Sequence, residues 1–231
     1  MYGSPLMEAD FLFITESSAE VNLLREGIDK GKIFFVGNIM IDTLLLNLQS
    51  AKDLNILEQY NLKEKKYALM TIHRPSNVDD IASFRKIIKI INYTQERIKV
   101  FFPIHPRTTK RLREFDLEKD LSKSNLILSE PIGYLEFLNL MINSKFILTD
   151  SGGIQEEASY LHVPILTLRE NTERPITVEK GTNQIVGTDF ELIKTYIDEI
   201  FKNKYKNGQQ IEKWDGKTAE RIVNIIQEKL Y

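Results

Sequence analysis

The sequence predicts an α/β fold: a Rossmann-like parallel sheet with helices on both faces. Short apolar runs rich in β-branched and aromatic residues recur along the chain, and amphipathic helical patterns separate most of them. The runs are continuous rather than alternating, which is typical of strands buried on both faces of a parallel sheet. The expected strands are 11–14, 33–36, 67–72, 100–104, 126–128, 146–148 and 165–168.

The helices expected between these strands are marked by apolar stripes and by end signals. Residues 17–27 begin with Ser17 and Glu20 at the spacing of a capping box, and Gly27 can take the left-handed conformation that ends a helix. Segment 79–97 carries one stripe, made of Ile81, Phe84, Ile87, Ile88 and Ile91. A closing helix is expected over 216–230, with three residues facing inward: Ile222, Ile225 and Ile226.

Composition limits the class of protein. With 42% hydrophobic and 28% charged residues among 231, the chain can bury a substantial core, and its net charge of −2 favours neither nucleic acid nor an anionic membrane as a partner. It has no cysteine for disulfides or thiolate metal sites, which fits a reducing compartment. No apolar run approaches the roughly 18 residues of a spanning helix, and the first residues lack the pattern of a secretory signal. We therefore expect a cytoplasmic protein with no membrane or nucleic-acid partner.

Polar residues gather where the expected strands end. "YALMTI" leads into His73 and Arg74, "VFFPI" into His105, "KFILT" into 150–153, and "PILTL" into the arginine-containing segment 169–174. In open parallel sheets, ligands bind beyond the carboxyl ends of the strands. The sequence therefore predicts one binding site formed by these loops.

The stretch "ILTDSGGIQEEA" indicates what this site binds. Gly152 and Gly153 stand between a strand and a helix, where unpaired backbone N–H groups and the helix dipole favour an anion. Glycines let an anion approach those donors, and the Ser151 hydroxyl adds another. Arginines such as Arg174 supply forked donors suited to phosphate oxygens. We interpret the site as a diphosphate pocket, although a tight turn would also explain paired glycines.

Several other candidate residues have a structural reading beside a functional one. His73 and His105 could cap the chain at strand ends, and a structural hydrogen bond suits a histidine that precedes proline. His162 is most simply a residue of a surface loop. Glu156 and Glu157 point about 100° apart on a helix, so only one can face a ligand well.

An aromatic residue raises the same question. Phe137 lies in the apolar pattern "GYLEFLNLMI", most of which suits a core, but it could instead lie against a flat base.

The motifs together resemble a known family. "TIHRPSNVDD", "FPIHPRT", "LTDSGGIQEEA", "LTLRENTERPITVEKGT" followed by "VGTD", and "DGKTAERI" occur in the order found in non-hydrolysing UDP-N-acetylglucosamine 2-epimerases. The resemblance implies a GT-B-like two-domain architecture with UDP between Rossmann-like halves. By this reading, 1–45 is the remnant of the N-terminal half, and 46–231 is the C-terminal UDP-binding domain with its closing helix 216–230.

The resemblance also implies a reaction and its ligands. UDP-GlcNAc and UDP-ManNAc would be interconverted by elimination and re-addition of UDP, without a metal or a nicotinamide cofactor, and the enzyme could be a homodimer. Matched by position, Ser151, Gly152 and Gly153 would hold the phosphates, with Arg174 nearby.

The remaining site residues follow from the same matching. Glu157 would bind the ribose hydroxyls and Phe137 would lie against the uracil. His73 would be the catalytic histidine of this chain, and Arg74 and His105 would line the nucleotide cleft.

The chain departs from the family pattern in two ways. It enters the pattern at "DFLFITESSAEVNLLREGI", so the acidic residues implicated in proton transfer upstream have no counterpart here, and Ser76 replaces the usual Glu. We therefore expect the UDP-binding half of an epimerase that is inactive alone. The alternatives are a UDP-sugar-binding module without turnover, or a GT-B glycosyltransferase.

Overall fold

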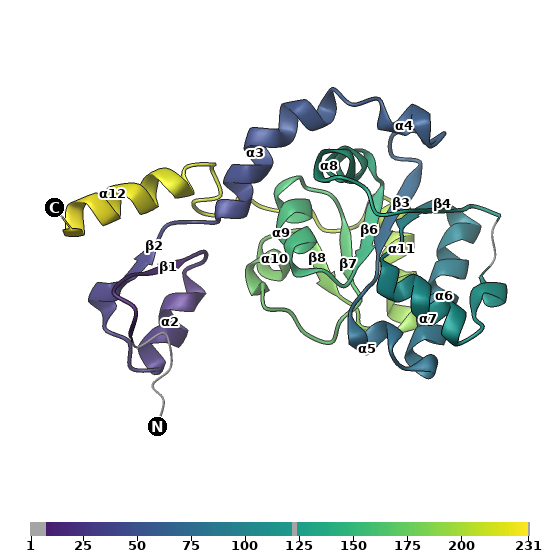
Figure 1. Ribbon diagram of the computed structural model, residues 1–231, viewed down its shortest axis with the longest axis horizontal. Helices are drawn as coiled ribbons and strands as arrows, with labels where there is room; N and C mark the ends of the chain where they lie inside the picture. Colours follow the sequence, from purple (N-terminus) through teal and green to yellow (C-terminus); the bar gives the residue numbers. More distant parts are fainter. Residues whose placement is uncertain (1–7, 122–123, 231) are drawn as a thin grey trace. The chain divides into compact units, whose positions relative to one another are not determined.

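The computed structural model describes residues 8–121 and 124–230, and the chain divides into two units (Figure 1). The larger unit is Leu48–Gln209, and the smaller combines Met1–Asn47 with Gln210–Tyr231. The division lies close to the expected boundary at 45/46, but the closing helix groups with the N-terminal segment and not with 46–231. Whether residues 1–45 are a remnant of another half stays a prediction.

The larger unit contains the predicted parallel sheet. All six of its strands run parallel in the order β5-β4-β3-β6-β7-β8, so the chain order reverses between β3 and β6. This is the strand order of a dinucleotide-binding Rossmann sheet. The strands are β3 (Tyr67–Thr71), β4 (Lys99–Pro103), β5 (Leu126–Ser129), β6 (Phe146–Thr149), β7 (Ile165–Thr167) and β8 (Asn183–Ile185).

Only β8 among these strands was not predicted. Its sequence, Asn183-Gln184-Ile185, carries no apolar run, because buried Asn183 is held by polar contacts instead. The side-chain oxygens of Asn183 and Thr167 are 2.6 Å apart across neighbouring strands, with the threonine hydroxyl as donor.

Helices cover both faces of the sheet, as predicted, and each face has its own core. On β3, Ala68 and Met70 belong to one core cluster, while Tyr67 and Leu69 belong to the other. The first cluster is covered by α6 (Ile81–Arg97), α7 (Pro106–Glu114) and α11 (Phe190–Phe201). The second is covered by α4 (Ile56–Gln59), α8 (Tyr134–Asn143) and α9 (Gly152–Tyr160). The unit also contains α5 (Pro75–Val78), α10 (Pro175–Glu179) and the 3₁₀ turn η2 (Glu118–Asp120).

The stripe predicted on α6 is confirmed except at its first residue. Phe84, Ile87, Ile88 and Ile91 are buried, whereas Ile81 is 39% exposed. The reason is its place in the first turn, where Asp80 caps the helix by accepting a hydrogen bond from the Ser83 N–H at 2.8 Å.

The smaller unit contains a two-stranded parallel sheet, the helices next to it in sequence and the closing helix. Its elements are β1 (Leu12–Ile14), α2 (Ser18–Arg25), η1 (Lys30–Lys32), β2 (Ile33–Phe35) and α12 (Thr218–Leu230), while α3 (Ile39–Lys52) continues from it into the larger unit. Gly27 ends α2 as predicted, with φ 85° and with the Ile28 N–H bonded to the Leu23 carbonyl at 3.1 Å.

The predicted capping box on α2 does not form. Ser17 has helical φ and ψ of −65° and −27° and makes no side-chain cap bond. A capping side chain reaches the first-turn N–H groups only from an extended backbone, which explains the failure.

Hydrogen bonds explain why the closing helix groups with residues 1–47. Lys213 Nζ donates to the Phe35 carbonyl at 2.7 Å, and Arg221 Nη1 donates to the Val36 carbonyl at 3.0 Å. Asp42 accepts from the Ala219 N–H at 2.8 Å, at the start of α12. The three isoleucines expected to face inward are half-buried, whereas neighbouring Val223 is 51% exposed. No helix among the described residues is long and apolar enough to cross a bilayer.

Candidate functional site

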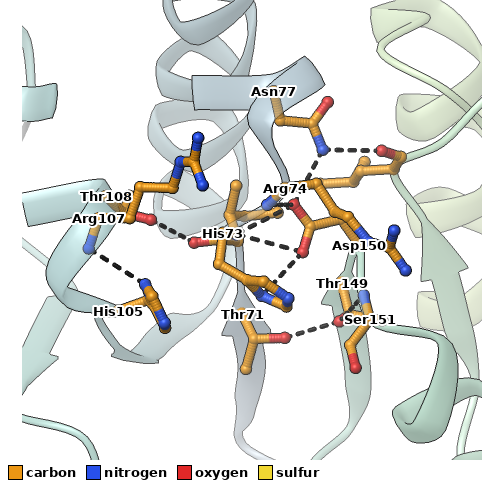
Figure 2. Close-up of polar contacts among 12 residues, drawn as sticks. Thr71, His73, Arg74, Asn77, His105, Arg107, Thr108, Thr149, Asp150 and Ser151 are labelled. Carbon is orange, nitrogen blue, oxygen red and sulfur yellow. Dashed lines mark hydrogen bonds and ion pairs between the residues drawn. The ribbon is translucent and has the colours of Figure 1, made fainter. Parts of the chain in front are cut away.

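The strand-order reversal brings two of the predicted loops together. β3 and β6 are neighbours, and the hydroxyl oxygens of Thr71 and Thr149 at their carboxyl ends are 2.6 Å apart (Figure 2). Just beyond these strand ends, His73 lies in one loop and Asp150 in the other. A reversal of strand order is where ligand crevices form in such sheets. The predicted convergence of these loops is therefore present in the larger unit.

Asp150 joins the two loops; the sequence placed it in one of the predicted site loops but assigned it no role. Its side chain is fully buried, and Oδ2 accepts hydrogen bonds from the N–H groups of His73 at 3.0 Å and Arg74 at 2.8 Å. Asn77 Nδ2 donates to the same oxygen at 3.0 Å and also to the Leu168 carbonyl at 3.0 Å (Figure 2). The carboxylate thus holds the β3 and β6 loops together, and Asn77 ties them to the end of β7.

The two histidines lie beside each other with different partners. His73 Nδ1 is 3.2 Å from Asp150 Oδ1, and 38% of the His73 side chain is exposed. The ring centroid of His105 lies 5.5 Å from that of His73, at an interplanar angle of 36°. His105 Nδ1 accepts the Arg107 N–H at 3.1 Å, which caps the start of α7 (Figure 2). The structural hydrogen bond considered for His105 is confirmed, and exposed His162 lies in a turn as expected.

The start of α9 is open, which bears on the paired glycines. Gly152 is the first residue of the helix and has no positive φ, and a Cβ built on it would meet nothing within 4 Å. Neither backbone conformation nor crowding within this chain therefore requires a glycine there. Ser151 is the N-cap residue before Gly152 and makes no side-chain cap bond, so its hydroxyl does not cap the start of the helix. The tight-turn explanation fails at Gly152, and the space in front of the helix N–H groups favours an approaching ligand.

The paired glutamates on α9 are both buried and have separate partners. Glu156 Oε1 lies 3.0 Å from Arg174 Nε, and the Arg174 side chain is 42% exposed. Glu157 Oε1 accepts the Tyr134 hydroxyl at 2.9 Å. Burial raises the pKa of Glu157, the bond from Tyr134 opposes that shift, and the neighbouring charge of Glu156 adds to it. Arg174, expected beside phosphates, is therefore also the counter-ion of a buried carboxylate.

Aromatic side chains near this helix come from α8. Phe137 is half-buried and packs against the second core cluster, as the core reading expects, and the contact with a base stays a prediction. Tyr134, 40% exposed on the same helix and bonded to Glu157, was not singled out from sequence. Its signal was weak, because an aromatic residue at the start of an apolar helix is ordinary.

A cavity of about 410 Å³ lies beside the loops, and Arg74 and Arg169 are among the residues that line it. Arg169 forms a two-bond ion pair with Glu173, with nitrogen–oxygen distances of 2.6 and 2.8 Å. These bonds lower the pKa of Glu173 to about 2. Among the residues that the structure describes, no group of acidic, histidine or cysteine side chains is arranged to hold a metal ion.

Comparison with known proteins identifies the family. A family model described as UDP-N-acetylglucosamine 2-epimerase matches residues 7–227. The chain belongs to the UDP-N-acetylglucosamine 2-epimerase family. It is 46% identical over 227 residues to the UDP-N-acetylglucosamine 2-epimerase of Methanocaldococcus jannaschii, covering 94% of this chain and 61% of that protein. The protein of the same name from Methanococcus maripaludis is 41% identical over 225 residues, with 94% and 61% covered. The family predicted from the motifs is confirmed.

Solved epimerase structures agree with the fold. A crystal structure of the M. jannaschii epimerase in complex with UDP-GlcNAc and UDP has a TM-score of 0.85 and 44% identity, with 95% of this chain and 61% of that chain covered. The epimerase of Neisseria meningitidis bound to UDP-GlcNAc gives a TM-score of 0.80 at 31% identity, with 95% and 62% covered. The predicted GT-B-like relationship is confirmed, and this chain spans about three fifths of the length of these relatives.

Proposed function

We propose that this chain supplies the UDP-binding part of a UDP-N-acetylglucosamine 2-epimerase, which interconverts UDP-GlcNAc and UDP-ManNAc. The observation that carries the proposal is the open start of α9, where Gly152 leaves unobstructed space beside the loop that bears His73. The names of the epimerase relatives and the UDP-GlcNAc in two of their structures support this ligand.

The proposed binding mode assigns each part of UDP to a feature of the larger unit. The diphosphate lies against the first N–H groups of α9, with the Ser151 hydroxyl as a further donor. Glu157 accepts the ribose hydroxyls with the oxygen that Tyr134 does not occupy. The half-buried ring of Phe137 faces the uracil, and Arg74, His105 and Arg174 line the remaining cleft.

The proposed reaction has two physical requirements. Charge that builds on the departing UDP must be stabilised, and fixed N–H donors and arginine side chains do this without reorganising. The proton at sugar C2 must pass to a base within hydrogen-bonding reach. In this chain, His73 is the candidate acceptor of a proton or of a hydrogen bond in the active site. The acidic residues implicated in proton transfer lie outside the motifs that this chain matches. We therefore expect UDP binding without significant turnover by the 231-residue chain.

Calorimetric titration of UDP into the purified chain tests this proposal, with Gly152→Ala as the decisive variant. Alanine at this position meets no protein atom, so the fold should keep its stability while the methyl group blocks the phosphates. We expect UDP affinity to fall at least about tenfold, the equivalent of about 1.4 kcal/mol. Gly31→Ala is the control, because Gly31 lies in the smaller unit and has no positive φ, and a Cβ there would meet only the exposed Asp29 side chain, 3.3 Å from Oδ1. Equal UDP affinity for both variants and the unaltered chain would contradict the proposed binding mode.

The alternatives differ in the chemistry after binding. Incubation of UDP-GlcNAc in deuterated water, monitored by NMR, reports exchange at C2 for an epimerase, and acceptor-dependent release of UDP indicates a glycosyltransferase. Saturable binding with neither result indicates a binding module. Homodimer formation and cytoplasmic location stay predictions from the sequence.

A further inference from the structure

The neighbouring histidines, His73 and His105, are held by groups of opposite hydrogen-bonding character. His73 Nδ1 faces Oδ1 of Asp150, a buried carboxylate that can only accept when ionised. His105 Nδ1 faces the Arg107 N–H, which can only donate. Each neutral imidazole has one donor and one acceptor nitrogen, so the partner of Nδ1 determines the state of Nε2.

We propose that these partners fix the two rings in opposite neutral tautomers. His73 carries its proton on Nδ1 and presents a bare Nε2, whereas His105 accepts at Nδ1 and carries its proton on Nε2. Asp150 is then a positioning residue for His73, and the start of α7 does the same for His105.

The different contacts of the two oxygens of the Asp150 carboxylate support this assignment. Oδ2 accepts from the N–H groups of His73 and Arg74 and from Asn77 Nδ2, at 3.0, 2.8 and 3.0 Å. Oδ1 is 3.2 Å from both the His73 N–H and His73 Nδ1. The three donors at Oδ2 hold the carboxylate in one orientation, which leaves Oδ1 within 3.2 Å of the imidazole Nδ1.

The pair of tautomers gives the site complementary chemistry within 5.5 Å, the distance between the ring centroids. A bare Nε2 on His73 accepts a proton, or a hydrogen bond from a hydroxyl or amide of a sugar. A protonated Nε2 on His105 donates to an anionic oxygen such as that of a phosphate. The use of these groups with a sugar nucleotide rests on the proposed function, but the tautomers themselves do not.

Nitrogen-15 NMR of the imidazole rings in the complete chain tests the proposal without ligand or activity. The sequence has only three histidines, and His162→Gln and His105→Gln assign the signals. At a pH where the rings are neutral, we expect Nδ1 of His73 and Nε2 of His105 to resonate as protonated nitrogens, and the other two as bare ones. The same tautomer in both rings, or rapid averaging at His73, would overturn the proposal.

Asp150→Asn provides an inversion test. The amide oxygen should take the position of Oδ2, with its three donors, so the amide NH₂ takes the position of Oδ1 and donates to His73 Nδ1. We expect His73 to change to the Nε2-protonated tautomer while His105 does not change. Asp79→Asn is the matched control, because Asp79 bonds Arg107 and Arg111 through their side chains. A folded Asp150→Asn variant with an unchanged His73 tautomer would refute the positioning role of Asp150. If that variant does not fold, the nitrogen-15 spectrum of the unsubstituted chain still tests the two tautomers.

Discussion

Removal of the Asn77 amide should loosen the three loops that it connects. Its Nδ2 donates to the buried Asp150 carboxylate and to the Leu168 carbonyl, both at 3.0 Å, and Asn77 is only 4% exposed. A hydrogen bond to a charged group contributes about 1.5–3 kcal/mol and one to a carbonyl about 0.5–1.5 kcal/mol. Asn77→Ala removes both, so we expect a loss of about 2–4.5 kcal/mol in the free energy of unfolding.

Urea unfolding monitored by circular dichroism measures this loss. With a denaturant dependence of about 2 kcal/mol per molar, the midpoint should fall by about 1–2 M. Asn47→Ala is the control, because the Asn47 amide donates to the Thr43 carbonyl of its own helix in an exposed place. That control should change the free energy of unfolding by less than about 0.5 kcal/mol. Equal effects of the two substitutions would show that the Asn77 bonds do not hold the loops together.

Three further predictions test burial and charge. Glu157→Gln should stabilise the fold at neutral pH, because burial raises the pKa of Glu157 in the folded state, and such a group lowers stability as the pH rises towards that pKa. The same substitution should weaken UDP binding about tenfold in calorimetry. Phe84→Ala should cost about 3–5 kcal/mol in urea unfolding, and Ile81→Ala, on the exposed edge of the same helix, less than about 1 kcal/mol. The ion pair of Arg169 with Glu173 depresses the pKa of the carboxylate from 4.5 to about 2, so its contribution is present above pH 4.5 and is lost as the pH falls towards 2. Thermal unfolding of Glu173→Gln and of the unaltered chain across this pH range should show the full difference above pH 4.5, a shrinking difference below it, and none near pH 2.

The sequence predicted the parts of the fold that depend on local patterns. The apolar runs of β3, β4 and β6 located the sheet, and the carboxyl ends of these strands predicted where the candidate site lies. Strand β8 was not predicted, because the buried Asn183 is satisfied by side-chain hydrogen bonds, and these leave no periodic pattern in the sequence. The capping box predicted from Ser17 and Glu20 does not form because Ser17 has a helical backbone conformation, which the residue types alone do not reveal.

The site was located more easily than its internal connections. Ser151 and the glycines could be read from the strand–helix junction, but the bond from Asn77 to Asp150 joins residues 73 positions apart. Such a contact depends on strand order, which the sequence pattern leaves open between β3 and β6. The grouping of α12 with residues 1–47 also depends on contacts between residues distant in sequence. Arg221 in this helix bonds the Val36 carbonyl, and Lys213, which precedes the helix, bonds the Phe35 carbonyl.

The buried carboxylate at the end of β6 has a consequence for how the site can respond to a ligand. Asp150 immediately precedes Ser151 and Gly152 in the chain, and its oxygens are held by the backbone of His73 and Arg74. A molecule that pulls the beginning of α9 towards itself must therefore draw the histidine along, or break bonds in a place that water does not reach. The position of the start of α9 and the position of His73 are therefore mechanically coupled through Asp150.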